Sequence, residues 1–248
     1  MSLAHRISIF SDAQTVAREL ATRIVDALED KPTLVLGLPT GRTPLLLYEQ
    51  LVRLASEARA DFSQVTTFNL DEFLGVPASH PGSYRSFMQR HFLDHVNIDP
   101  SRINFLNGAA ADPSEECCRY EKAIDDAGGL DLLILGIGTN GHIGFNEPAD
   151  GLTARTHRVT LKPETRRSNA ALFGGDLNAV PAEALSMGMG TILDAKSVVL
   201  LATGERKASC VEQLVTGRIT THLPASFLQL HPTVEIMLDS AAAGRLQR

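Results

Sequence analysis

Apolar and polar residues follow two patterns along this chain, and the two patterns alternate. Short, mainly apolar runs, typical of strands in a parallel sheet, occupy residues 33–38, 65–70, 130–135, 197–202 and 234–238. Helical patterns or helix-start signals mark residues 11–30, 44–58, 83–95, 113–127, 163–172 and 204–215. This alternation predicts the α/β class, with a doubly wound, mainly parallel sheet and helices on both faces.

Three helix starts are marked by capping residues. Ser11 or Asp12 can cap the first helix, and Asp112 with Pro113 begins a capping box. Thr43 is expected to be an N-cap, with Pro44 at the first helical position. No linker is visible, and the length suits one α/β domain, so residues 1–248 are expected to form a single domain.

Composition removes several classes of partner. The net charge is −6 and there is no basic block, so nucleic acid is not an expected partner. No apolar run reaches the length of a membrane span, and the N-terminus lacks the apolar core of a signal peptide. Three cysteines, two of them adjacent, do not form a disulfide framework, which favours a cytoplasmic protein with reduced thiols.

The loop after residues 130–135 concentrates the residues that can carry chemistry. Four glycines allow close approach of a ligand beside Asn140, His142 and Glu147. A histidine can transfer protons near neutral pH, and a carboxylate partner would orient it. Residues 136–141 also fit G-x-G-x-x-G, but no helix follows and the expected acidic residue is missing, which argues against a dinucleotide.

Other candidate positions follow neighbouring strands. Asp71 and Glu72 end a strand, where one carboxylate could face a crevice as a general base, or both could be loop or capping acids. The turn Thr40-Gly41-Arg42-Thr43 presents free N–H groups before a helix. That turn is equally compatible with a phosphate cradle and with a plain strand-to-helix connection.

Two further features of the sequence are weaker signals of a binding site. Lys207 lies at the start of a helix after another strand, where it could add positive charge at the same sheet edge or be solvated. His91 and His95 have a spacing seen in zinc sites, but no third ligand accompanies them, so no metal is expected.

Several of these stretches together resemble the glucosamine-6-phosphate deaminase (isomerase) family. The matching segments are LGLPTGRTP (36–44), TTFNLDEFLGVPASHPGSYRSFM (66–88), ILGIGTNGHIGFNEPAD (134–150), TR with SN (165–169), ALSMGMGTILDA (184–195) and LQLHP (228–232). The resemblance implies a single Rossmann-like domain and a cofactor-free reaction, in which glucosamine 6-phosphate and water give fructose 6-phosphate and ammonia.

The resemblance also implies roles for the candidate residues. Asp71 would remove the C2 proton and return it at C1, and His142 would open the sugar ring. Glu147 would hold and tune the histidine, and Asn140 stands where some members carry aspartate. The phosphate of the sugar phosphate would be bound by Thr40, Gly41, Arg42, Thr43 and Lys207.

Besides Asn140, the chain departs from the family pattern at two further functional places. Ala171 replaces an arginine that some members use for the phosphate, and Arg42 could supply that charge instead. Asp150, His157 and Val159 stand where regulated members have basic residues, so activation by N-acetylglucosamine 6-phosphate is not expected. Association into a homo-oligomer is possible.

Two other functions share the predicted fold. One is a sugar-phosphate hydrolase of the 6-phosphogluconolactonase type, against which the TFNLDE stretch argues. The other is a non-catalytic sugar-phosphate sensor. The presence of Asp71, His142 and Glu147 together favours catalysis over the sensor.

Overall fold

The computed structural model describes residues 6–246, and its elements follow the order expected from the sequence. The strands are β1 (Arg6–Phe10), β2 (Val35–Leu38), β3 (Thr66–Asn69), β4 (Asp71–Phe73), β5 (Ile103–Asn104), β6 (Leu132–Gly136), β7 (His157–Thr160), β8 (Glu183–Ser186), β9 (Val198–Ala202) and β10 (Val234–Asp239). The α-helices are α1 (Ala13–Asp30), α2 (Leu45–Ser56), α3 (Tyr84–His91), α4 (Pro113–Asp126), α5 (Pro163–Asn169), α6 (Met189–Leu193) and α7 (Ala208–Thr216). Short 3-10 helices are η1 (Leu93–His95), η2 (Pro100–Arg102), η3 (Ala170–Phe173), η4 (Glu205–Lys207) and η5 (Pro224–Leu230).

Seven strands form one parallel sheet in the order β1-β10-β9-β6-β2-β3-β5. From β2 the chain moves outward through β3 to β5. It then returns to the other side of β2 as β6 and continues outward through β9 and β10. The strand order therefore reverses between β2 and β6. In such sheets a crevice opens outside the carboxyl ends of the strands at the point of reversal, and ligands bind there.

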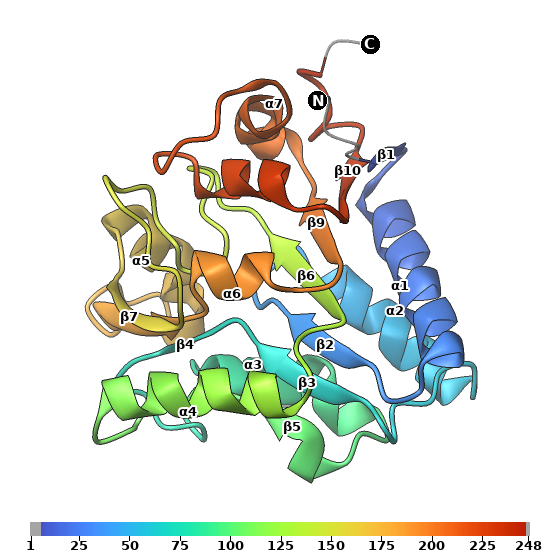
Figure 1. The fold of residues 1–248 in the computed structure, drawn as a ribbon, viewed down its shortest axis with the longest axis horizontal. Coiled ribbons are helices and arrows are strands. Elements are labelled where there is room, and N and C mark those ends of the chain that lie inside the picture. Colours follow the sequence, from blue (N-terminus) through green and yellow to red (C-terminus); the bar gives the residue numbers. More distant parts are fainter. Residues whose placement is uncertain (1–5, 247–248) are drawn as a thin grey trace.

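Helices cover both faces of this sheet (Figure 1). Helices α1, α2 and α3 pack on one face, against side chains such as Leu36 and Leu201. Helices α4, α6, α7 and η5 pack on the other face, against side chains such as Leu133 and Leu200. Because successive residues of β9 point to opposite faces and both faces are covered, the strand is apolar throughout. The predicted doubly wound sheet is confirmed.

A second sheet of three antiparallel strands, β4-β8-β7, was not predicted. It packs through Phe73 and Ala184 in a small apolar cluster with Tyr84, Phe145 and Phe173. The carboxylates of Asp71 and Glu72 therefore lie in a separate strand, β4, rather than in a loop at the end of β3. This sheet fixes the chain that follows β3 above the edge of the large sheet.

One predicted cap is wrong. Helix α2 begins at Leu45 with Pro44 as its N-cap residue, and no side chain caps it, so Thr43 is not the cap. The helix thus begins one residue later than the sequence indicated, although Pro44 itself has φ −77° and ψ −6°, near the helical region. The caps at Asp12 and Asp112 are confirmed, because both side chains accept N–H groups of the first turn. None of the helices within residues 6–246 is long and apolar enough to cross a membrane.

The Tyr120 hydroxyl connects α4 to the end of β3, just before the candidate site. Its O–H donates to the Asn69 carbonyl at 2.6 Å, and the ring is fully buried. Tyr120→Phe should lower the free energy of unfolding by about 1–3 kcal/mol, because it leaves the carbonyl unpaired. Urea unfolding measures this, with Lys122→Ala on the exposed side of α4 as a control expected to stay within about 0.5 kcal/mol. Equal stability of the two variants would contradict the prediction.

Candidate active site

The candidate residues converge because their strands are neighbours in the large sheet. Residues 40–43 follow β2, residues 137–147 follow β6, and Lys207 follows β9. These three strands are adjacent and parallel, so their carboxyl ends meet at one edge. Asp71 comes directly after β3, the next strand on the other side of β2. All four segments thus lie at the edge where the strand order reverses.

The His142 ring lies directly against the backbone of Gly138. A side-chain carbon at position 138 would lie 2.3–2.6 Å from the ring atoms of His142, so only glycine fits beneath the imidazole. The N–H of Gly138 donates to the His142 carbonyl at 2.9 Å and closes the loop. Gly141 has φ +85° and leaves no room for a side chain beside Leu223. The glycines of this loop therefore set the position of the histidine.

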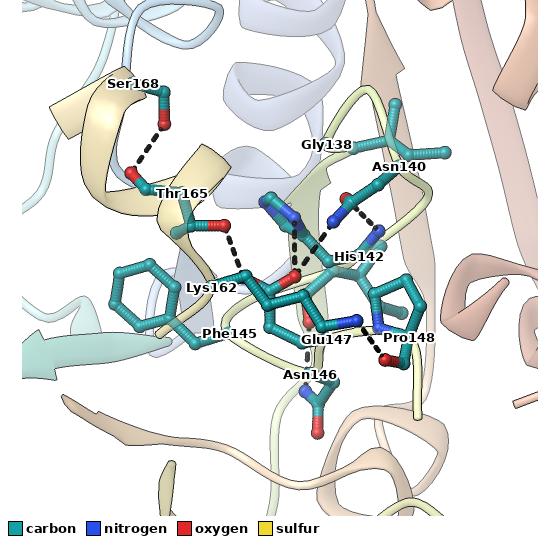
Figure 2. A network of polar contacts seen from close by, with 12 residues as sticks. Gly138, Asn140, His142, Phe145, Asn146, Glu147, Pro148, Lys162, Thr165 and Ser168 are labelled. Carbon is teal, nitrogen blue, oxygen red and sulfur yellow. Dashed lines mark hydrogen bonds and ion pairs between the residues drawn. The ribbon is translucent and has the colours of Figure 1, made fainter. Parts of the chain in front are cut away.

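His142 faces a buried carboxylate. Its Nδ1 lies 3.6 Å from Oε2 of Glu147 and has no hydrogen-bond partner among the described residues. The Asn140 side-chain amide donates to the same Oε2 at 2.9 Å, and the backbone N–H of His142 donates to the side-chain Oδ1 of Asn140 at 3.3 Å (Figure 2). Asn140, His142 and Glu147 thus form one contiguous group, as the sequence predicted.

Glu147 is held in its charged form. Burial alone would raise the pKa of its carboxyl, but the interaction with His142 and the hydrogen bonds from Thr165 and Asn140 outweigh burial and hold the pKa at about 2. The Thr165 hydroxyl, from α5, donates to the other oxygen, Oε1. An ionised carboxylate in this position can orient a histidine and stabilise its protonated form.

Asp71 has the opposite environment. It is 6% exposed, and among the described residues the single hydrogen bond to its side chain is a long one, 3.5 Å from the Thr40 hydroxyl to Oδ1. Burial, together with the neighbouring Glu72 carboxylate, raises the pKa of Asp71 to about 8. A carboxylate with so high a pKa is a much stronger base than an ordinary aspartate.

Glu72 points the other way, as two adjacent residues of a strand must. Its carboxylate accepts backbone N–H groups from Phe73 and Tyr84 at 2.9 Å and from Arg85 at 3.0 Å. Glu72 therefore anchors the start of α3 and is not available to a ligand at the sheet edge. Of the two carboxylates, Asp71 is the one left for chemistry.

Asp71 lies beside the histidine loop. A side-chain carbon at Gly144 would be 3.8 Å from Oδ2 of Asp71 and 3.0 Å from the Ser186 hydroxyl. Ser186 is paired with Asp71 in the small sheet, and its hydroxyl accepts the Phe145 N–H at 3.0 Å. The pairing of β4 with β8 thus brings the raised-pKa carboxylate next to the residues that follow His142.

The predicted phosphate-binding positions surround the same edge. Gly41 has φ +111°, a conformation that requires glycine in the turn. Arg42 is exposed, whereas Thr40 and Thr43 are partly buried. The Lys207 ammonium donates to the Ile137 carbonyl at 2.6 Å, which fastens η4 to the loop after β6. Burial lowers the pKa of Lys207. Ala171, by contrast, is an exposed residue of η3 and offers no charge.

Sequence reasoning missed two groups. Thr165 belongs to the TR segment of the resemblance and to a predicted helix, but the sequence gives it no role, because nothing local shows that a buried helix residue touches a loop carboxylate. The pair Tyr84 and Asn169, joined at 2.9 Å, connects α3 to α5 near Thr40 and Asp71. Within residues 6–246 no cluster of three or more histidine, cysteine or acidic side chains could hold a metal ion.

This architecture, a doubly wound sheet with a basic carboxylate and a histidine–carboxylate pair at its carboxyl edge, defines a class of α/β proteins acting on small polar ligands. The chain belongs to the family of glucosamine-6-phosphate isomerases and 6-phosphogluconolactonases, whose model matches residues 11–236.

Individual relatives cover nearly the whole chain. A glucosamine-6-phosphate deaminase of Hahella chejuensis is 46% identical over 242 residues, which is 98% of this chain and 92% of that protein. Glucosamine-6-phosphate deaminase 1 of Giardia intestinalis is 47% identical over 226 residues, 91% of this chain and 85% of that protein.

Solved structures show the same fold. A monomeric glucosamine-6-phosphate deaminase superposes with a TM-score of 0.93 at 41% identity, covering 96% of this chain and 99% of the other. The 6-phosphogluconolactonase of Trypanosoma cruzi superposes with a TM-score of 0.78 at 20% identity, covering 100% of this chain and 99% of the other. The second likeness concerns the fold alone.

The contrast between the acidic groups can be measured without a substrate. In protein labelled with ¹³C-aspartate, one side-chain carboxyl should titrate near pH 8, and its signal should be missing in Asp71→Asn. Glu72→Gln should lower that pKa, because it removes a neighbouring negative charge. The exposed Asp194→Asn serves as a control and should leave the signal unchanged. Titration of every aspartate below about pH 5, the ordinary range, would contradict the assignment.

Proposed function

We propose that this protein is a glucosamine-6-phosphate deaminase, which converts glucosamine 6-phosphate and water into fructose 6-phosphate and ammonia. The observation that carries the proposal is Asp71, a buried carboxylate with a pKa of about 8 placed beside the His142 loop. The relatives that are 43–47% identical to this chain bear that name. The chemistry needs one strong carboxylate base and one group that moves a proton between sugar oxygens.

The histidine–carboxylate pair suits ring opening. His142 takes the proton of the C1 hydroxyl and delivers one to the ring oxygen as the bond from C1 to that oxygen breaks. The ionised Glu147, 3.6 Å from Nδ1, stabilises the ring while it carries the extra proton. Asn140 keeps the carboxylate turned toward His142.

Asp71 then acts on the open chain. The ammonium group of the substrate favours the ionised carboxylate, because an opposite charge within a few ångströms lowers a carboxyl pKa. The carboxylate removes the C2 proton, while the C1 aldehyde oxygen takes, by way of water, the proton that the ammonium group gives up. The carboxylate then returns its proton to C1, so that C1 becomes a CH2OH group and C2 is left double-bonded to nitrogen as an iminium. Water adds to the iminium carbon, and ammonia leaves with the C2 carbonyl formed. Every proton is carried by side chains and water, so no cofactor enters this scheme.

The phosphate is held at the carboxyl ends of β2 and β9. Backbone N–H groups of the Thr40–Thr43 turn and the Lys207 ammonium offer donors to its oxygens. Arg42 supplies the second positive charge, in place of the arginine that Ala171 replaces. Residues from 40 to 207 contribute to one site, which supports a single catalytic domain over residues 1–248.

A 6-phosphogluconolactonase is the alternative within the family. Lactone hydrolysis needs an activated water but no base at C2, so it would not require a carboxylate with the high pKa of Asp71. A non-catalytic sensor would leave both the Asp71 and the His142–Glu147 arrangements unused.

We place the protein in the cytoplasm, where sugar phosphates are made, and its three cysteines are free thiols there. Association of copies stays a prediction.

Substrate assays separate these functions. The purified protein should release ammonia from glucosamine 6-phosphate, and Asp71→Asn should reduce the rate by at least about 10²-fold, because general-base catalysis contributes that much or more. Galactosamine 6-phosphate and 6-phosphogluconolactone are assayed alongside. Hydrolysis of the lactone without ammonia release from either amino sugar would make the protein a lactonase, and no turnover of any of them would favour the sensor.

The charge of Arg42 can be tested separately from the chemistry. Arg42→Ala should raise KM for glucosamine 6-phosphate by about tenfold or more and change kcat by less than about threefold, because a hydrogen bond to a charged group contributes about 1.5–3 kcal/mol. Arg59→Ala removes the same charge from an exposed position after α2 and is the matched control. An unchanged KM in Arg42→Ala would show that Arg42 does not bind the phosphate.

A further inference from the structure

One buried hydroxyl from another element contacts the carboxylate that serves His142. Thr165 is 3% exposed and lies in the first turn of α5, and its O–H donates to Oε1 of Glu147 (Figure 2). The two oxygens of Glu147 therefore have different surroundings. Oε1 is held by Thr165, whereas Oε2 faces the Asn140 amide at 2.9 Å and the His142 Nδ1 at 3.6 Å.

The first turn of α5 is fastened to this loop at a second point. The Lys162 ammonium donates to the carbonyl of Pro148, the residue after Glu147. The Thr165 carbonyl accepts the Asn169 side-chain amide at 2.9 Å, so the backbone of Thr165 is also held. The Thr165 hydroxyl is thus presented to Glu147 from a rigid position rather than from a mobile side chain.

A carboxylate can rotate about its last side-chain bond and so change which oxygen it offers. A donor fixed on one oxygen opposes that rotation and leaves the other oxygen pointed at its partner. The contact with His142 tolerates little rotation. Within residues 6–246 the buried Nδ1 has no hydrogen-bond partner, and its distance from Oε2, 3.6 Å, already exceeds that of a normal hydrogen bond. A small rotation of Glu147 would remove the contact with the ring.

We propose that Thr165 is a positioning residue for ring opening, because its hydroxyl holds Oε1 of Glu147 and thereby keeps Oε2 aimed at His142. The inference rests on the proposed deaminase function for the step it affects. The hydrogen-bond arrangement on which it acts does not depend on which sugar phosphate is bound.

Three variants of α5 separate the hydroxyl from the packing of the side chain. Thr165→Val keeps the shape and removes the donor, and Thr165→Ser keeps the donor and removes a methyl group. Ser168→Ala is the matched control, because it removes a hydroxyl of the same helix that bonds Thr165 and not Glu147. The assays are ammonia release from glucosamine 6-phosphate and inhibition by 2-amino-2-deoxyglucitol 6-phosphate, an open-chain analogue that needs no ring opening.

Thr165→Val should lower kcat by about 10- to 100-fold, the usual effect of losing such an orienting partner. Its inhibition constant for the open-chain analogue should stay within about threefold of the wild type, because the sugar-binding groups are intact. Thr165→Ser and Ser168→Ala should keep kcat within about threefold. A wild-type kcat in Thr165→Val, or an equal loss in Thr165→Ser, would overturn the proposal. Should Thr165→Val not fold, Thr165→Ala takes its place with the same limits.

A second readout needs no activity and so separates this inference from the proposed function. The ring ¹⁵N signals of His142, assigned by their absence in His142→Gln, should shift in Thr165→Val and stay unchanged in Ser168→Ala. If the wild type releases no ammonia but these signals shift, the deaminase function is wrong while the positioning role holds. If the signals do not move, Thr165 does not position the pair.

Discussion

The structure depends on how three carboxylates are buried at one edge of a parallel sheet. A buried charge is costly unless donors surround it, and the three have very different numbers of donors. Glu72 accepts three backbone N–H groups, and Glu147 is contacted by Thr165, Asn140 and His142. Asp71 receives one long hydrogen bond. These environments separate the pKa values of Asp71 and Glu147, about 8 and about 2, and so divide the roles of base and fixed charge.

The large sheet could be predicted because its central strands are buried on both faces and appear as short, mainly apolar runs. The small sheet could not, since its strands are short and partly polar, as in His157–Thr160. They pair through contacts between residues more than 20 positions apart, such as Asp71 with Ser186. The wrong cap at Thr43 has a local cause, because Pro44 fits both the N-cap and the first helical position.

The site was predictable to the extent that it lies on the loops that leave parallel strands. Strand order decides which loops meet, and the apolar runs with glycine-rich exits identify those loops at Gly41 and Gly138. The contact of Thr165 with Glu147 was not predictable, because it depends on the packing of α5 against the loop after β6. The orientation of the Glu72 side chain was not predictable either, because it is set by backbone N–H groups at the start of α3, 12 residues later in the chain.

Asn140 has a consequence that an aspartate at the same position would not have. Its Nδ2 donates to Glu147 at 2.9 Å, so the amide adds a donor to the buried carboxylate. An ionised aspartate there would place a second negative charge at that distance, and like charges this close raise the pKa of one partner. With asparagine at position 140, Glu147 carries the one negative charge among Asn140, His142 and Glu147. The His142 Nδ1 therefore faces one carboxylate oxygen, Oε2 of Glu147. The orientation of that one carboxylate therefore decides whether the histidine is supported, and this is why a hydroxyl fixed on α5 matters to a proton transfer in the loop after β6.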